Sequence, residues 1–207
     1  MSNDPISYYH QNARTFMAQY DSMDAQQVHA RWSDRLAQLP VGRALDVGAG
    51  SGRDARWLAA LGWQVTAVEP AAALRQRAQC RAASAIAWVD DRLPDLAQVR
   101  SHSPQFGLIL LSAVWMHVTP ASRPAALKGL ASLLDQGGLM VFTLRFGPAD
   151  PQRPMYPVSL DELRALAGPL AMSVETLSGG VLEKDQLDRP EVSWQTVLLR
   201  HVAGGCL

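Results

Sequence analysis

The sequence predicts an α/β fold built on a doubly wound, mostly parallel sheet, and three observations lead to this prediction. Strand-like apolar segments alternate with helix-like segments between residues 43 and 144. A glycine-rich turn joins the first strand of this series to its first helix. Two strands near the C-terminal end have no helix between them, so they should pair antiparallel. We therefore expect seven strands, with the last one antiparallel to most of the sheet.

Two helices are expected before the first strand. Apolar residues between Tyr9 and Tyr20 recur at the spacing of one helix face. A second stripe of that spacing consists of Val28, Trp32, Leu36 and Leu39. The Pro-Val-Gly segment at 40–42 then breaks the helical pattern. This predicts a helical prelude over residues 1–40 and one globular unit over residues 41–207.

The alternating series follows in order along the chain. The expected elements are strand 43–48, helix 54–61, strand 64–69, helix 71–81, strand 86–89, strand 106–112, helix 121–134 and strand 139–144. Strand 106–112 is apolar throughout, which is typical of a strand buried on both faces. The Gly137-Gly138 pair should end the preceding helix and lead into the next strand.

The C-terminal part predicts a helix and two strands. Ser159 and Glu162 stand at capping-box spacing before a helix that Pro169 should stop. Strands are expected over 172–177 and 194–200, and the charged segment between them, 179–191, is most simply a solvated loop.

Composition narrows the classes of partner. The 207 residues are 48% hydrophobic, enough for a sizeable core, and 19 basic residues balance 19 acidic ones. A chain without net charge is a poor ligand for a nucleic acid or an anionic membrane surface. The first ten residues lack a signal-peptide pattern, and the longest apolar run is too short to span a bilayer, so we expect a cytoplasmic protein. Cys80 and Cys206 have no neighbours at metal-ligand spacing, so neither a zinc site nor a disulfide framework is expected.

The segment Leu45-Asp46-Val47-Gly48-Ala49-Gly50-Ser51-Gly52-Arg53 is the most informative part of the chain. Its glycines leave room for a ligand to lie against backbone amides at a helix N-terminus. Glu69 closes the next strand, where a carboxylate can accept hydrogen bonds from two ribose hydroxyls. A single glycine turn is often an ordinary tight loop, but strand, glycines, helix and acid in this order predict a nucleoside cofactor site.

A nicotinamide dinucleotide site is the nearest alternative, because it also uses a glycine turn and a downstream acid. The dinucleotide pattern has its third glycine where this chain has Arg53. Asp46 would also be unfavourable beside a pyrophosphate but suits a cationic ammonium group. A nicotinamide-dependent oxidoreductase is therefore the less favoured function.

These features resemble motif I of the class I, Rossmann-like S-adenosylmethionine-dependent methyltransferases. The resemblance implies that Asp46 and the glycine loop hold the methionine part of the cofactor, that Glu69 holds the ribose, and that no metal is required. It implies that Asp90 or Asp91 binds the adenine amino group and that Pro70 covers one adenine face, although these residues could instead cap a helix or begin one. The cofactor-binding residues expected on this basis are Asp46, Gly48, Ala49, Gly50, Gly52, Arg53, Glu69, Pro70, Asp90, Asp91, Ser112 and, from the prelude, Tyr9 and Arg14.

The acceptor is expected to be a small molecule. Family members that methylate exocyclic amines of nucleobases usually carry Asn or Asp, two prolines and an aromatic residue after the fourth strand, and this chain has Ser112-Ala113-Val114-Trp115 there. Neither cysteine is placed for attack on a cytosine ring. The expected substrate-binding residues are Trp115, Met116 and Tyr156, with Phe146 and Met155 near them, and each of these could equally belong to the core.

His117 is the candidate acid–base residue, since it follows the fourth strand at the sheet edge where open α/β sheets bind ligands. It could instead hydrogen-bond the acceptor or cap a turn, because transfer to a neutral nucleophile needs no base. The prelude, with Tyr8, Tyr9 and Arg14 near its start, is expected to close over the site as a lid or to stay docked on the sheet. A methyltransferase-like protein that binds the cofactor without turnover is the remaining alternative.

Overall fold

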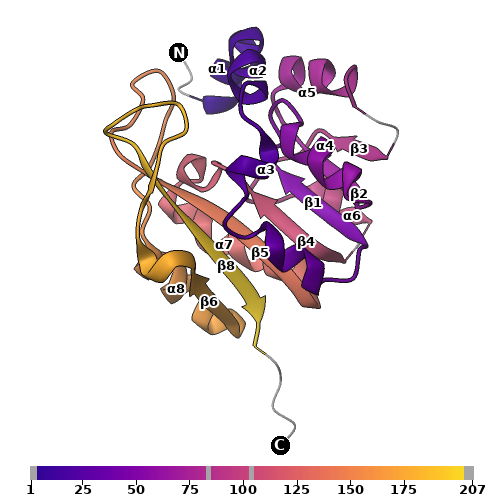
Figure 1. Ribbon diagram of the computed structural model, residues 1–207, viewed down its shortest axis with the longest axis vertical. Helices are drawn as coiled ribbons and strands as arrows, with labels where there is room; N and C mark the ends of the chain where they lie inside the picture. The colour runs from indigo at the N-terminus through magenta and orange to yellow at the C-terminus, as the bar shows by residue number, and fades with distance from the viewer. Residues whose placement is uncertain (1–3, 83–84, 103–104, 203–207) are drawn as a thin grey trace, which may run out of the picture.

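A computed structural model describes residues 4–82, 85–102 and 105–202 of the chain. Its sheet has the order β3-β2-β1-β4-β5-β8-β6, and a two-residue strand, β7, pairs with β8 (Figure 1). The strands are β1 Arg43–Val47, β2 Gln64–Val68, β3 Ile86–Val89, β4 Phe106–Leu111, β5 Leu134–Phe146, β6 Met172–Thr176, β7 Glu183–Lys184 and β8 Ser193–His201. Strands β1 to β5 pair in parallel, whereas β8 runs antiparallel to both β5 and β6. The predicted fold class is thus confirmed.

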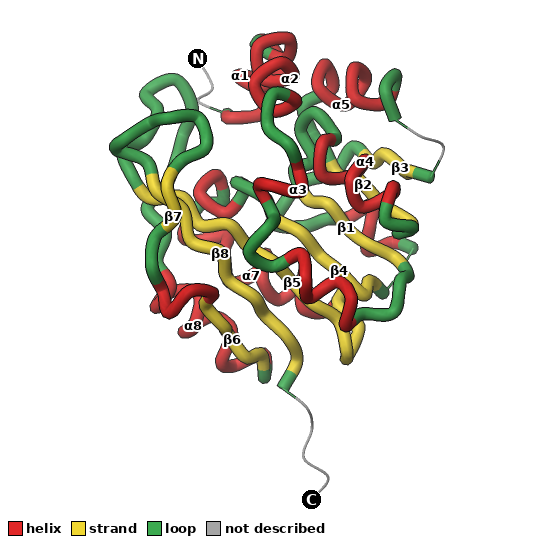
Figure 2. Tube along the Cα trace, in the orientation of Figure 1, coloured by secondary structure: helices red, strands yellow, loops and turns green. Residues whose placement is uncertain are grey.

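Helices cover both faces of the sheet (Figure 2). They are α1 Pro5–Gln11, α2 Ala13–Asp21, α3 Ala25–Val28, α4 Arg53–Ala60, α5 Ala72–Gln79, α6 Ala97–Ser101, α7 Arg123–Leu133 and α8 Leu160–Ala167. Short 3₁₀ helices are η1 Ser33–Gln38, η2 Trp115–His117, η3 Pro120–Ser122, η4 Gly168–Leu170 and η5 Leu177–Gly180. Among the described residues no helix is long and apolar enough to cross a membrane.

Alternation along the central strands divides the core into two layers. Ile109 and Leu111 of β4 pack with the residues of α6, α7 and α8, whereas Leu108 and Leu110 pack with those of α4 on the opposite face. Every one of these four side chains is buried, as the apolar sequence of this strand predicted. The central strands are thus packed against helices on both faces.

The prelude differs from its prediction in both helices. The first helix is divided at Asn12, whose side-chain amide donates a hydrogen bond to the carbonyl oxygen of Tyr8 at 2.9 Å and so competes with the helical backbone bond. The second is only α3 followed by η1. Between them the side chains of His29 and Trp32 turn inward against Trp57, and this tertiary packing outweighs the helical spacing.

The segments on either side of β5 also correct the sequence analysis. Strand β5 begins at Leu134, directly after α7, so the glycine pair lies inside the strand rather than in a turn before it. A side chain at Gly138 would lie 3.1 Å from the carbonyl oxygen of Gly107, where the register of β4 and β5 shifts. Helix α6 was not predicted, because five residues are too few to show a helical period.

The charged segment 179–191 is not simply a solvated loop. It contains η5 and strand β7, and Glu183 and Lys184 pair with β8. Asp185 is buried, and its carboxylate accepts hydrogen bonds from Arg189 and from Trp194 Nε1. The Leu187 amide donates to it as well, so this one buried carboxylate orders the segment beside the sheet.

Two further expectations have clear outcomes. Ser159 caps α8, because its hydroxyl oxygen accepts a hydrogen bond from the Glu162 amide at 3.0 Å, as predicted. Cys80 is exposed and free, whereas Cys206 lies outside the described residues.

Candidate functional site

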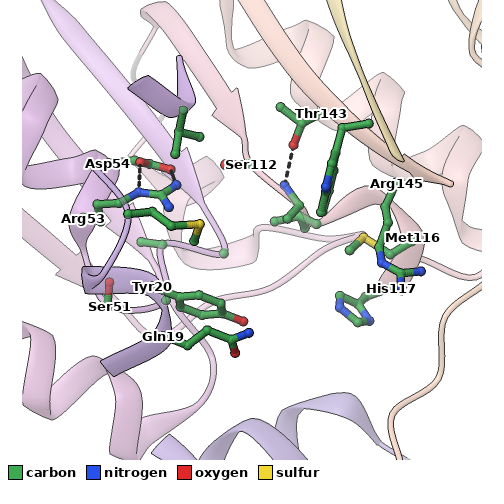
Figure 3. Close-up of a pocket in the computed structure, with 18 of the residues that line it drawn as sticks. Gln19, Tyr20, Ser51, Arg53, Asp54, Ser112, Met116, His117, Thr143 and Arg145 are labelled. Atoms are coloured by element: carbon green, nitrogen blue, oxygen red, sulfur yellow. Dashed lines mark hydrogen bonds and ion pairs between the residues drawn. The ribbon is translucent and has the colours of Figure 1, made fainter. Parts of the chain in front are cut away.

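A cavity of about 260 Å³ lies where the carboxyl ends of β1, β2, β4 and β5 meet the prelude. Its floor comes from the glycine loop after β1 and from the segment 112–117 after β4. Helices α1 and α2 contribute Tyr9, Gln19 and Tyr20, and the segment around β7 closes a further side. Figure 3 shows Arg53 and Asp54 on one side of this space and Met116, His117 and Arg145 on the other. The cavity is therefore long enough to present two chemically different ends.

The glycine loop has the backbone geometry that its sequence predicted. Gly48, Gly50 and Gly52 have φ angles of 71°, 55° and 75°, which other residues rarely adopt. The amides of Gly48 and Ala49 donate hydrogen bonds to the carbonyl oxygen of Val68 at 2.8 and 2.9 Å, so the loop is held against the end of β2. A side chain at Gly48 would lie 2.6 Å from Val114. Only glycines let this loop pass so closely under the segment after β4.

Glu69 is the acid that organises the loop. Its carboxylate accepts hydrogen bonds from the amides of Gly50 and Ala71, each at 2.8 Å, and the residue is only 6% exposed. Burial raises the pKa of Glu69 to about 7, although both amides act to lower it. Each oxygen accepts one of these bonds and has a further lone pair, and Glu69 lines the cavity, so the side chain can accept additional hydrogen bonds from hydroxyl groups of a ligand.

Asp46 lies behind the loop rather than in the cavity wall. It is fully buried, and its Oδ2 atom has no hydrogen-bond partner among the described residues. Burial and the neighbouring Asp54 raise the pKa of Asp46 well above its ordinary value. An unpartnered buried carboxylate oxygen is unfavourable in isolation, and a cationic group nearby would relieve this.

Asp54, by contrast, is fully partnered. Arg53 donates two hydrogen bonds to it at 2.7 and 2.9 Å, and His29 Nε2 lies 3.0 Å from its Oδ1 atom. Burial alone would raise the pKa of Asp54, but His29 and Arg53 lower it below its ordinary value. Asp54 thus fixes the direction in which Arg53 lines the cavity, as Figure 3 shows.

The predicted cofactor residues fall into two groups in the structure. Those that line the cavity are Tyr9, Gly48, Ala49, Gly50, Arg53, Glu69, Pro70 and Ser112. Arg14 is exposed and is not part of the cavity wall, and Gly52, which is also outside the wall, is the N-cap residue of α4. Asp90 is exposed and forms an ion pair with Arg75 at 2.7 Å.

Asp91 has the structural role that the sequence left open as an alternative. Its Oδ2 atom accepts hydrogen bonds from the amides of Gln98 and Val99 at 2.8 and 3.0 Å, and so caps α6. Its Oδ1 atom accepts one from the Arg92 amide. Neither Asp91 nor Asp90 reaches the cavity wall, so an adenine contact from either residue stays a prediction.

The expected acceptor residues require one clear correction. Trp115 is 0% exposed and packs edge-on against Phe142, with 5.1 Å between ring centroids, so it belongs to the core. Met116 lines the cavity as expected. Tyr156 is half-buried outside the cavity wall, where its amide donates a hydrogen bond to the Met116 carbonyl oxygen at 2.8 Å. Trp115 and Met116 differ because they are consecutive residues of the short 3₁₀ helix η2, which directs their side chains to different sides.

Phe146 and Met155, which were expected near the acceptor, are both partly buried against the main core. Neither belongs to the cavity wall.

His117 lines the cavity and is held by two hydrogen bonds. Its Nδ1 atom lies 2.8 Å from the Pro154 carbonyl oxygen, which can only accept, so Nδ1 carries the proton. Its Nε2 atom then accepts from the Tyr9 hydroxyl at 3.0 Å. Burial, together with the charges of nearby Arg153 and Arg145, lowers the pKa of His117 to about 4, although the hydrogen bond to Pro154 acts to raise it. The imidazole is therefore neutral near pH 7, with Tyr9 as the donor to its free lone pair.

Several cavity residues were not foreseen from the sequence. Arg145 at the end of β5, Arg153 in the following loop and Asp185 after β7 all belong to the wall. Arg153 also donates to the Tyr9 hydroxyl and lies 5.3 Å from the centre of its ring. No spacing links these three positions, since they converge only when the antiparallel β8 brings the C-terminal segment beside β5.

The chain resembles known methyltransferases in sequence. A family model described as a methyltransferase domain matches residues 21–174. The ubiquinone biosynthesis O-methyltransferase of Xanthomonas campestris pv. campestris is 34% identical over 113 residues, which are 54% of this chain and 46% of that protein. The chain thus spans about half the length of the curated relatives it matches.

Solved structures share the fold. The N-methyltransferase NodS from Bradyrhizobium japonicum WM9 has a TM-score of 0.67 at 18% identity, covering 85% of this chain and 95% of that chain. The magnesium protoporphyrin IX methyltransferase of Synechocystis PCC 6803 with bound SAM has a TM-score of 0.63 at 17% identity, with 94% and 80% coverage. A Burkholderia thailandensis 1,6-didemethyltoxoflavin-N1-methyltransferase with bound substrate and S-adenosylhomocysteine has a TM-score of 0.62 at 20% identity, with 96% and 90% coverage.

Proposed function

Because this chain belongs to the methyltransferase-domain family whose model matches residues 21–174, we propose that it transfers the methyl group of S-adenosylmethionine to an O, N, S or C atom of a small-molecule acceptor. The observation that carries this proposal is the buried carboxylate of Glu69, bonded to the Gly50 amide at the edge of the cavity. The nicotinamide-dependent oxidoreductase considered from the sequence belongs to another family and is dropped.

The residues present fit this cofactor in two respects. Glu69 keeps acceptor capacity for two ribose hydroxyls, and the glycines that line the cavity leave no side chain in the way of a nucleoside. The unpartnered oxygen of Asp46 behind that loop suits the cationic methionine part. When bound, the cofactor would supply an activated methyl group on its sulfonium.

The chain's own contribution is alignment and exclusion of water. Tyr9 and Tyr20 from the prelude cover the cavity, while Ser112 and Met116 form its floor after β4. The opening of this cover as a lid stays a prediction. A neutral His117 would act as a base only where the acceptor's own proton replaces the Tyr9 hydroxyl at Nε2. We propose a cytoplasmic location and a small-molecule partner rather than a nucleic acid.

The test of this function is product formation. The purified chain is expected to bind S-adenosylhomocysteine in calorimetry and to release it from S-adenosylmethionine with at least one member of a broad acceptor panel. A Glu69→Ala variant, which should lose most cofactor affinity, is the matched control for contaminating activity. Binding of S-adenosylmethionine without release of S-adenosylhomocysteine across the panel would leave a non-catalytic binding module as the function.

A further inference from the structure

We propose that the acceptor carries a carboxylate group and that Arg145 binds this carboxylate at the end of the cavity opposite the glycine loop. This inference rests on the proposed function, since it names the substrate class of the same site. It follows from the balance of charges around Arg145, from the geometry of its guanidinium and from its place in the cavity.

Three guanidinium groups gather at this end of the cavity, and two of them have carboxylate partners. Arg153 Nε lies 3.0 Å from Asp150 Oδ2. Arg189 donates two hydrogen bonds to Asp185, at 2.8 and 2.7 Å. Both neighbouring charges are thus compensated within the chain.

Arg145 differs from its neighbours. Its Nη1 atom donates to the carbonyl oxygen of Pro148 at 2.9 Å, but within the described residues it forms no ion pair. Its Nε atom is buried and has no hydrogen-bond partner in the described part of the chain. Burial and the charges of Arg189 and Arg153 lower the pKa of Arg145 from its ordinary value. A charge and a buried donor that the protein leaves uncompensated are costly, and a bound anion would satisfy both.

The charge count favours a monoanion. Glu183 also lines the cavity, but its carboxylate forms an ion pair with Arg31 at 3.2 Å. The three guanidinium groups then face two carboxylates, Asp150 and Asp185, which leaves one positive charge at this end. Lys184 also lines the cavity, but it is exposed, so solvent screens its charge. Two adjacent N–H groups of a guanidinium match the two oxygens of a carboxylate, whereas a phosphate dianion would exceed the available charge.

The position of Arg145 assigns the anion to the acceptor rather than to the cofactor. Figure 3 shows Arg145 beside Met116 and His117, across the cavity from Arg53 and Asp54 at the start of α4. The glycine loop and Glu69 belong to that other end. An acceptor bound by its carboxylate at Arg145 would therefore extend its nucleophile toward the middle of the cavity, over the apolar side chain of Met116.

Binding of simple probes tests the assignment without knowledge of the natural acceptor. Benzoate, benzamide and phenyl phosphate are titrated against the protein saturated with S-adenosylhomocysteine, and thermal shift and calorimetry give the dissociation constants. Benzoate at about 10 mM is expected to raise the melting temperature, and benzamide, its uncharged isostere, is not. Arg145→Gln should weaken benzoate binding by roughly tenfold or more, the effect typical of losing a bidentate charged pair. The control Arg164→Gln removes a half-exposed arginine of α8 and should change nothing.

Each other outcome overturns the proposal in a distinct way. Equal binding of benzoate and benzamide, or no binding of either, would show that no carboxylate site exists. Tighter, Arg145-dependent binding of phenyl phosphate would assign the site to phosphate. A tenfold loss of S-adenosylhomocysteine affinity in Arg145→Gln, with benzoate binding intact, would assign Arg145 to the cofactor. If the protein fails to bind S-adenosylhomocysteine at all, the proposed function fails, and the same titrations on the free protein still decide whether Arg145 binds a carboxylate.

Discussion

Cofactor affinity should depend on pH through Glu69, and the structure gives the size of the effect. The side chain is buried with a pKa raised to about 7, and ribose hydroxyls are bound best by its charged form. Binding that requires the charged carboxylate weakens tenfold for each pH unit below that pKa. Lowering the pH from 8 to 6 should therefore raise the Kd for S-adenosylhomocysteine about tenfold, which is a loss of about 1.4 kcal/mol of binding free energy.

Calorimetry at pH 8, 7 and 6 measures this dependence, and buffers of different ionisation enthalpy report the proton released on binding. Glu69→Ala should bind about 1 to 3 kcal/mol more weakly at pH 8 and lose the pH dependence, because both the hydrogen bonds and the titrating group are gone. The control Asp161→Asn, at a carboxylate whose side chain is 92% exposed, should keep the wild-type profile. A wild-type Kd that is the same at pH 6 and 8 would refute the reasoning. A pH dependence that persists in Glu69→Ala would assign the titration to another group, such as Asp46, whose pKa is also raised by burial.

The same pKa shift has a defined sign for the stability of the free protein. The pKa of Glu69 lies above its ordinary value of 4.5, so the folded state holds this proton more tightly than the unfolded chain does. The resulting stabilisation is complete below pH 4.5 and is lost as the pH rises through about 7. Bound cofactor should offset that loss, so its effect on the melting temperature should be larger at pH 8 than at pH 6.

Three further predictions address the loop, the core and the acceptor end. Gly50→Ala places a side chain at a φ of 55° and 3.2 Å from Tyr20, so it should cost about 1 to 2 kcal/mol of stability and weaken S-adenosylhomocysteine binding in calorimetry. The control Gly137→Ala places its side chain in open space and should change neither quantity. Trp115→Ala should lower the free energy of unfolding by about 3 to 5 kcal/mol in denaturant titrations, and Trp115→Phe should restore most of it; a stable Trp115→Ala protein with only a raised KM would return this residue to the acceptor site. If His117 is a base, His117→Ala should lower kcat roughly 100-fold, whereas Tyr9→Phe should keep the wild-type kcat. The pH profile of the wild-type rate should then show a titration near the His117 pKa of about 4. Equal losses of kcat in both variants would show that His117 only positions Tyr9.

The cofactor end of the site was predictable because its geometry is local. The strand, the three glycines and the helix that follow one another at 43–60 fix the loop, and Glu69 directly follows the neighbouring parallel strand. Both features therefore had to meet at the same sheet edge. The sequence could not assign Asp91, since a carboxylate before a short helix suits a cap and a ligand contact equally well, and only the bonds to Gln98 and Val99 distinguish the two.

The acceptor end was much less predictable because it depends on contacts between distant segments. Trp115 follows β4 as Met116 does and both are buried, and only the turn of η2 decides which of the two lines the cavity. Asp185 lies in a charged segment whose composition is typical of a solvated loop, yet its bonds to Arg189 and Trp194 bury it. The bond to Trp194 depends on the antiparallel strand β8, and no residue spacing in the sequence indicates it.

The two ends of the cavity differ in what holds them in place, and this difference bears on acceptor specificity. The glycine loop is held by backbone hydrogen bonds to Val68, which are independent of side-chain identity, whereas the acceptor end is held by side chains such as His117 bonded to the Pro154 carbonyl oxygen. Substitutions in the loop following β5 can therefore change the charge and shape of the acceptor end without altering the backbone that supports the cofactor end. Arg145, at the end of β5 beside this loop, is the clearest case, because its charge has no carboxylate partner among the described residues and would select among acceptors by what binds to it.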